Sequence, residues 1–94
     1  MISYSSSSEK IKICKNLIQV RLKGMSDNNL FHFAQQQIVF IETHIQADGK
    51  MLVYDYDNVT IGMMCVKELE GIDDEFCNAV YDMNTAIRPP NYEV

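Results

Sequence analysis

Hydrophobic residues recur at three- and four-residue steps in three stretches of the chain, a spacing that places them on one face of a helix. In the first stretch they are Ile11, Cys14, Leu17, Ile18, Leu22 and Met25. In the second they are Leu30, Phe31, Phe33, Ala34, Ile38, Phe40, Ile41 and Ile45. In the third they are Ile72, Phe76, Ala79, Val80, Met83, Ala86 and Ile87. The pattern therefore predicts three amphipathic helices.

Polar residues and glycine mark the expected ends of these helices. Ser6 and Glu9 have the spacing of a capping box at the start of the first helix, and Gly24 is expected just past its end. Ser26 is the expected cap of the second helix. The acidic pair that begins at Asp73 suits the positive end of the third helix.

Residues 50–66 show a different pattern, because apolar residues alternate on both sides of Asp57 and Asn58. Both of these residues tolerate the left-handed backbone of a tight turn, so we expect a β-hairpin there. The predicted cross-strand pairs are Tyr56 with Val59, Tyr54 with Ile61, and Leu52 with Met63. A lone hairpin is marginally stable. A further strand is therefore expected from residues 1–4 or from a second copy of the chain.

The predicted fold is α+β, as one small domain over residues 1–94: two N-terminal helices, a central antiparallel hairpin and a C-terminal helix. Two alternatives stay open at this point. Residues 18–22 also fit a strand, and Gln37–Gln46 is either helix or a strand that turns at Asp48-Gly49. Exposed sheet edges and a small core favour a homodimer.

The amino-acid composition limits the cellular compartment and the class of protein that we expect. Hydrophobic residues make up 47% of the 94 residues and charged residues 22%, as in a globular protein. The longest aliphatic and aromatic run is Ile38–Ile41, and no secretory pattern is seen, so neither a membrane span nor export is expected. Three cysteines (Cys14, Cys65 and Cys77) lack metal-ligand spacing and predict buried free thiols in the cytoplasm.

Charge is distributed unevenly along the chain. Residues 1–41 hold five basic and two acidic side chains, whereas residues 42–94 hold eleven acidic and three basic ones. The net charge of −5 is thus +3 in the first part and −8 in the second. Such asymmetry bears on partners and on association between copies rather than on the fold.

The acidic residues around the expected hairpin and the segment after it are the main functional candidates. They are Asp55, Asp57, Glu68, Glu70, Asp73, Asp74 and Glu75. Carboxylates at intervals resemble phosphates and attract a basic protein. Tyr54 and Tyr56 either pack within the expected sheet or anchor the interface with that protein. The leading hypothesis is a non-enzymatic inhibitor, of the immunity or anti-restriction type, of a basic nucleic-acid-processing enzyme. The plain alternative is an acidic face that only keeps the protein solvated.

Two other functions compete with this hypothesis. Asp55 and Asp57 on one side of a strand suit a divalent-metal hydrolase, but no third ligand stands at a recognisable spacing. A basic row from Lys12 to Lys23, with Lys15 and Gln19 between them, suits a nucleic-acid-binding regulator. The acidic net charge argues against direct nucleic-acid binding. No catalytic residue, metal site or cofactor is predicted.

Overall fold

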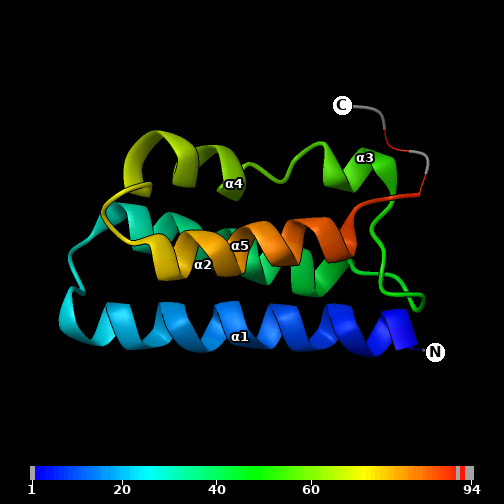
Figure 1. Cartoon of the computed structure of the whole chain (residues 1–94), viewed down its shortest axis with the longest axis horizontal. Helices are drawn as coiled ribbons and strands as arrows, with labels where there is room; N and C mark the ends of the chain where they lie inside the picture. The colour runs from blue at the N-terminus through cyan, green and yellow to red at the C-terminus, as the bar shows by residue number, and fades with distance from the viewer. Residues whose placement is uncertain (1, 91, 93–94) are drawn as a thin grey trace.

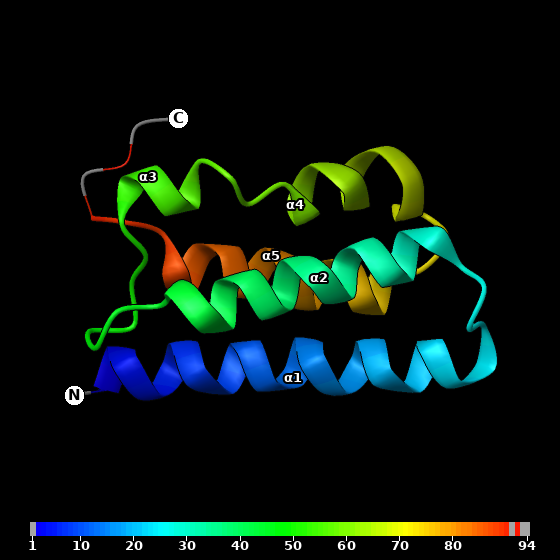
Figure 2. The same cartoon turned by 180° about the vertical axis from the view of Figure 1, so that it is seen from behind.

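The computed structural model describes the backbone of residues 2–90 and 92 and the side chains of residues 7–90 and 92, and this part of the chain is helical without strands. Its helices are α1 (Ile2–Gly24), α2 (Asn29–His44), α3 (Val53–Tyr56), α4 (Ile61–Met64), η1 (Cys65–Leu69) and α5 (Asp74–Ile87). Helices α1, α2 and α5 pack along one another (Figure 1). The α3–α4–η1 segment forms a further layer over α2 and α5, on the side away from α1, as Figure 2 shows from behind. We call residues 52–70 the strap.

One apolar cluster holds these layers together. Its buried members are Ile11, Cys14, Ile18, Phe31, Ala34, Ile38, Ile41, Met51, Ile61, Met64, Cys65, Leu69, Phe76, Cys77, Val80, Met83 and Ile87. All three long helices were correctly predicted from their apolar spacing, and each contributes the predicted face to this core. The exceptions are Met25 and Ile72, which lie outside the helices and are exposed, and Phe33, which lies within α2 but is 37% exposed.

The predicted hairpin, and with it the α+β fold class, is wrong. Residues 1–4 were expected as a strand, but α1 already begins at Ile2. In the strap, three of the six residues expected on the packed face of the hairpin are exposed: Leu52 by 56%, Tyr54 by 79% and Met63 by 60%. Of that expected face only Ile61 is fully buried, and the residues buried beside it are Met64, Cys65 and Leu69. Their three- and four-residue spacing is helical, and burial of this face decides the structure.

The strand alternatives for residues 18–22 and 37–46 are also wrong, because both segments lie within helices apart from the last two residues of the second. Helix α2 ends at His44, and the Ile45 amide still donates to the Ile41 carbonyl at 2.9 Å. The Asp48-Gly49 pair does form a turn, with φ of 83° at Gly49, but it connects α2 to the strap rather than two strands.

The helix ends differ from the sequence predictions in three of four cases. Asn28 rather than Ser26 caps α2, accepting a hydrogen bond from the Phe31 amide at 3.1 Å. Gly24 is the last residue of α1 rather than the residue after it. Asp73 lies at the positive end of α5 as expected, but as its N-cap rather than in its first turn, accepting a hydrogen bond from the Phe76 amide. The Ser6 side chain lies outside the described side chains, but the helix begins before it.

The three cysteines are buried and free, as predicted. Burial raises the pKa of the Cys14 thiol to about 12 and also raises the pKa values of Cys65 and Cys77. The thiols therefore stay protonated at neutral pH, and they act as small core side chains rather than as nucleophiles. In the described part of the chain, no helix has both the length and the apolar character needed to span a membrane.

Candidate partner-binding surface

The strap is fastened to α2 by one side chain, Gln37. Its Oε1 accepts hydrogen bonds from the amides of Thr60 at 2.7 Å and Ile61 at 3.1 Å. These amides lie at the start of α4, where a helix has no intrahelical partners for its N–H groups. Gln37 therefore caps α4 from a neighbouring helix and fixes the middle of the strap over the core.

The strap is also held close to α5. A Cβ atom on Gly62 would lie 2.6 Å from Nδ2 of Asn84, so the two helices meet where the chain has no side chain. At the α3 end, the Tyr56 hydroxyl donates to the Asn84 carbonyl at 3.2 Å, and its ring meets the Tyr92 ring edge-on at 4.7 Å. Tyr56 therefore serves the fold, while its neighbour Tyr54 faces solvent.

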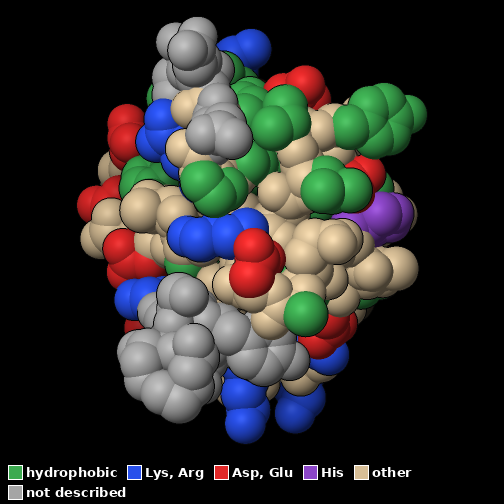
Figure 3. Space-filling model, turned by 90° about the vertical axis from the view of Figure 1, so that its right-hand side faces the viewer, with side chains coloured by type: hydrophobic (Ala, Val, Ile, Leu, Met, Phe, Trp, Pro, Cys, Tyr) green, Lys and Arg blue, Asp and Glu red, His purple; other side chains and the backbone are tan. Residues whose placement is uncertain are grey.

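The outer side of the strap carries exposed large hydrophobic residues from α3, α4 and η1. They are Leu52, Val53, Tyr54, Met63 and Val66. Viewed from the end of the molecule that carries α3, hydrophobic side chains gather in the upper part, over the strap (Figure 3). Exposed apolar groups in such density are typical of interaction surfaces rather than of an ordinary surface.

A shallow hollow of about 320 Å³ runs between α2 and the α4–η1 end of the strap. Leu30, Phe33, Met63 and Met64 give it an apolar lining. Lys67 and Glu68 lie at its charged side. Methionine side chains adapt to the shape of what they contact, so this hollow suits an apolar side chain presented by a partner protein.

The predicted acidic residues are not one cluster in the fold. Asp55 and Asp57 lie at the α3 end of the strap, and Glu68 and Glu70 lie at the opposite end, at η1 (Figure 1). None of the four is in an ion pair with a described side chain, although Glu70 accepts a hydrogen bond from the Tyr81 hydroxyl. The strap thus combines exposed apolar groups with carboxylates at both of its ends.

The three acidic residues that follow the strap serve the fold. Arg21 donates to both carboxylate oxygens of Asp73, at 2.6 and 2.9 Å, and to Glu75 at 3.0 Å. The hydrogen bonds from Arg21 hold the pKa of Asp73 below its ordinary value. Asp74 accepts a hydrogen bond from the Gly71 amide at 2.8 Å, in a turn where Gly71 has φ of 84°.

The uneven charge of the sequence is partly neutralised within one molecule. Besides Arg21, two lysines of α1 pair with acidic residues of the neighbouring helices: Lys10 with Asp82 at 3.9 Å, and Lys15 with Glu42 at 3.0 Å. The basic part of the sequence therefore packs against its acidic part. Of the basic row, Lys12 and Lys23 stay exposed, and two separated lysines are a sparse surface for phosphates.

The structure gives no support to a metal site at Asp55 and Asp57. These residues lie two positions apart in one helical turn, where side chains point in different directions. Within the described residues, no three potential metal ligands among His, Cys, Asp and Glu come together.

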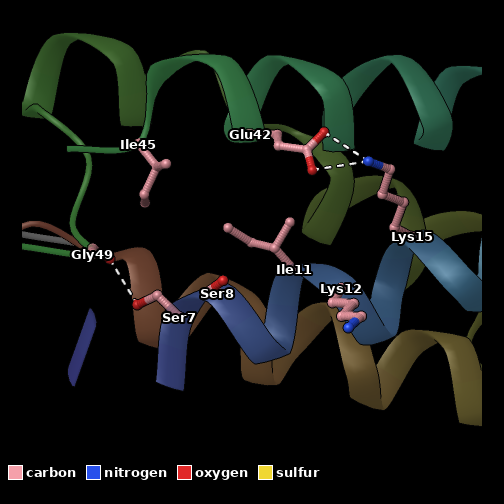
Figure 4. Close-up of a pocket in the computed structure, with 8 residues that line it drawn as sticks. All are labelled: Ser7, Ser8, Ile11, Lys12, Lys15, Glu42, Ile45 and Gly49. Carbon is pink, nitrogen blue, oxygen red and sulfur yellow. Dashed lines mark hydrogen bonds and ion pairs between the residues drawn. The ribbon is translucent and has the colours of Figure 1, made fainter. Parts of the chain in front are cut away.

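A second hollow, of about 310 Å³, lies between α1 and α2 (Figure 4). Three of its polar side chains, Ser7, Lys15 and Glu42, are engaged with the protein, whereas Ser8 and Lys12 are exposed. The Ser7 hydroxyl donates to the Gly49 carbonyl at 2.7 Å, and Lys15 binds both carboxylate oxygens of Glu42. The hollow is therefore a joint between helices, and among the described side chains no serine that lines it is hydrogen-bonded to a base.

Sequence reasoning proposed Tyr54 as an interface residue, a role that stays a prediction, and it did not propose the exposed Met63 and Val66. It placed Met63 on the packed face of a hairpin. The helical spacing of Ile61, Met64 and Leu69 was the signal that places Met63 and Val66 on the outside.

Comparison with known proteins gives one match. A family model described as Tsi6 matches residues 7–88, which is most of the chain. No curated protein and no solved structure matches the chain.

Proposed function

Because the chain belongs to the Tsi6 family, an immunity-type family of type VI secretion, we propose that it neutralises a toxin by binding it with the outer face of the strap. Membership in an immunity-type family implies a partner toxin and a role as a binding protein. The observation that carries the location is the row of exposed apolar residues along the strap, of which Tyr54 and Met63 are the most exposed.

This surface has the composition of a binding surface. Tyrosine and methionine are enriched at the centres of protein interfaces, and a large exposed tyrosine is a frequent energetic anchor. The strap is held over the core by Gln37 and Tyr56, so the surface is formed before the partner arrives. Binding then costs little ordering entropy.

The charge of the strap supports a partner with a basic surface. Residues 52–70 carry four acidic side chains and one lysine. Carboxylates at both ends of an apolar surface steer a basic protein toward it and fix its orientation. A nucleic-acid-processing toxin has such a surface and is the class that the sequence predicts. Because Asp73 and Glu75 bind Arg21, the acidic surface we propose is limited to Asp55, Asp57, Glu68 and Glu70.

Inhibition in this proposal needs no chemistry from the chain. An interface of ordinary size covers about 800 Å² on each partner, enough to close the entrance of a substrate site. We place this encounter in the cytoplasm, where the free thiols of the core stay reduced.

The proposal is tested by titrating the toxin against strap variants. The toxin is first identified by affinity capture with the tagged chain from its own cells, then purified as an inactivated domain for calorimetry. Tyr54→Ala and Met63→Ala are each expected to weaken binding roughly 30-fold, the equivalent of about 2 kcal/mol. Val39→Ala on α2 is the matched control, since Val39 is 51% exposed and lies outside the strap; it should leave the affinity within about two-fold.

Charge is tested separately through the association rate. Asp57→Asn combined with Glu68→Gln should lower the rate constant of association about ten-fold and flatten its dependence on salt. Glu9→Gln, an exposed acid of α1, should change neither. Unchanged binding by all strap variants, with loss of binding by a variant on α1, would show that the toxin binds another face.

A further inference from the structure

Helix α1 carries a second apolar row that the core uses only in part, through Leu17. Ile13, Leu17 and Val20 follow one another at steps of four and three residues, the spacing of a coiled-coil seam. Ile13 is 49% exposed and Val20 is 64% exposed, while Leu17 is partly buried between them. At the same helical spacing, Lys10 precedes this row and Gly24 follows it.

The row borders a groove between α1 and α5. This groove has a volume of about 270 Å³, and its apolar floor is formed by Ile13, Leu17 and Ala79. Charged side chains stand along it, with Lys10 and Asp82 toward the start of α1 and Glu75 toward its end. An apolar floor between charged rims has the anatomy of a small protein interface.

We propose that this row is the contact surface of a homodimer, in which two copies pack their α1 helices antiparallel about a two-fold axis at Leu17. A two-fold axis makes the surface complementary to itself. Around Leu17, Ile13 of one copy then lies beside Val20 of the other, and each row fills the groove of the opposite copy. All the large apolar residues of the row are covered.

The charges beside the groove select the antiparallel direction. In each copy, Lys10 and Asp82 line one end of the groove and Glu75 lines the other, and the exposed Lys23 lies in the last turn of α1 at the same end as Glu75. An antiparallel arrangement brings Lys10 of one copy toward Glu75 of the second, and Asp82 toward Lys23. A parallel arrangement would instead bring Lys10 beside Lys10 and Glu75 beside Glu75, which is unfavourable.

The proposed dimer leaves the strap uncovered. Helix α1 lies on one side of α2 and α5, and the strap lies on the other (Figure 2). One dimer can thus carry two toxins. The contact also differs from the sheet-edge dimer that the sequence predicts, because the described part of the chain has no sheet to extend.

Sedimentation of the isolated chain tests the association. The contact is small, so we expect a dissociation constant in the micromolar range, measurable between roughly 1 and 500 µM. Val20→Glu should raise that constant at least ten-fold by burying a charge at the seam, and Val39→Glu should leave it unchanged. Circular dichroism of both variants verifies the fold. A wild-type chain that stays monomeric over this range, or equal association by both variants, overturns the proposal.

Cross-linking tests the direction independently. Ile13→Cys and Val20→Cys are prepared as separate variants, and the three natural thiols are buried and do not interfere. Under mild oxidation the mixture of the two variants should give the disulfide-linked dimer, and each variant alone should give little. Efficient linkage of either variant with itself, or none in the mixture, overturns the antiparallel arrangement.

Discussion

Arg21 shows how much one residue decides in this fold. Its guanidinium binds both oxygens of Asp73, reaches Glu75, and lies 5.7 Å from the centre of the Phe76 ring. It therefore ties the end of α1 to the first turn of α5. A count of charges along the sequence treats these acidic residues as free, because their partner is more than fifty positions away.

The pair of Arg21 and Asp73 gives the first prediction. Asp73→Asn keeps an N-cap oxygen for α5 but removes the charge, and should lower the free energy of unfolding by about 1.5–3 kcal/mol at pH 7. Asp73→Ala should cost about 1 kcal/mol more, because the cap is lost as well. Urea denaturation measures the free energy of unfolding of both variants. Asp27→Asn, at an exposed position, is the control, and its free energy of unfolding should lie within about 0.5 kcal/mol of that of the wild type.

The same pair predicts a pH dependence. Arg21 lowers the pKa of Asp73 in the folded state, so this carboxylate contributes stability at every pH above its unfolded pKa of about 3.9. That contribution is lost as the pH falls through the lowered folded pKa. The difference in unfolding free energy between wild type and Asp73→Asn should therefore be constant from about pH 5 to 7, where the Asp73 carboxyl is ionised in both the folded and the unfolded state. This difference should become smaller at lower pH. A difference that does not change in acid would contradict this account.

Gly62 gives a second prediction at the residue scale. An added Cβ would press on the Asn84 carboxamide, so Gly62→Ala should lower stability by about 1 kcal/mol despite the better helix propensity of alanine. In an Asn84→Ala background the obstruction is gone, and the Tyr56 hydrogen bond to the backbone of residue 84 remains. There the same substitution should be neutral or stabilising. Equal effects in both backgrounds would exclude the contact between Gly62 and Asn84.

At the scale of elements, the sequence was sufficient for the long helices and insufficient for the strap. Helices α1, α2 and α5 each repeat their apolar spacing over several turns, which favours helix over the strand alternatives for residues 18–22 and 37–46. The strap is built from helices of four and five residues. In helices as short as these, the positions of Leu52, Tyr54 and Met63 fit the alternating pattern of a strand as well as the outer face of helices. Packing against the core beneath the strap decides between strand and helix, and this packing cannot be read from the local sequence pattern.

The dependence of the strap on Gln37 is a prediction about this element. Gln37→Ala leaves the Thr60 and Ile61 amides without their acceptor, and should cost about 1 kcal/mol, as loss of a helix cap does. Hydrogen exchange of the amides from Thr60 to Met64 should become faster, while exchange in the middle of α1 stays unchanged. Gln37→Glu retains an acceptor oxygen and is the matched control. Equal exchange in both variants would show that Gln37 does not hold the strap.

In the whole molecule, the fold separates acidic residues that stabilise the structure from acidic residues that stay exposed on the strap. Asp73 and Glu75 hold α5 to α1, whereas Asp55, Asp57, Glu68 and Glu70 stay on the strap without ion pairs among the described residues. Sequence reasoning reached an immunity-type binding protein from charge and from the lack of catalytic motifs, and the family match agrees with that class. It could not separate structural from exposed carboxylates, because that separation depends on contacts between distant segments.

The central claim is that the toxin binds the strap, and amide hydrogen exchange of the chain with and without toxin tests it most directly. The account predicts slower exchange in the complex for amides of residues 52–70, at both the α3 end and the η1 end. Amides of α1 from Ile11 to Lys23 should keep the exchange rates of the free chain. Slower exchange confined to α1, with residues 52–70 unchanged, would contradict the account.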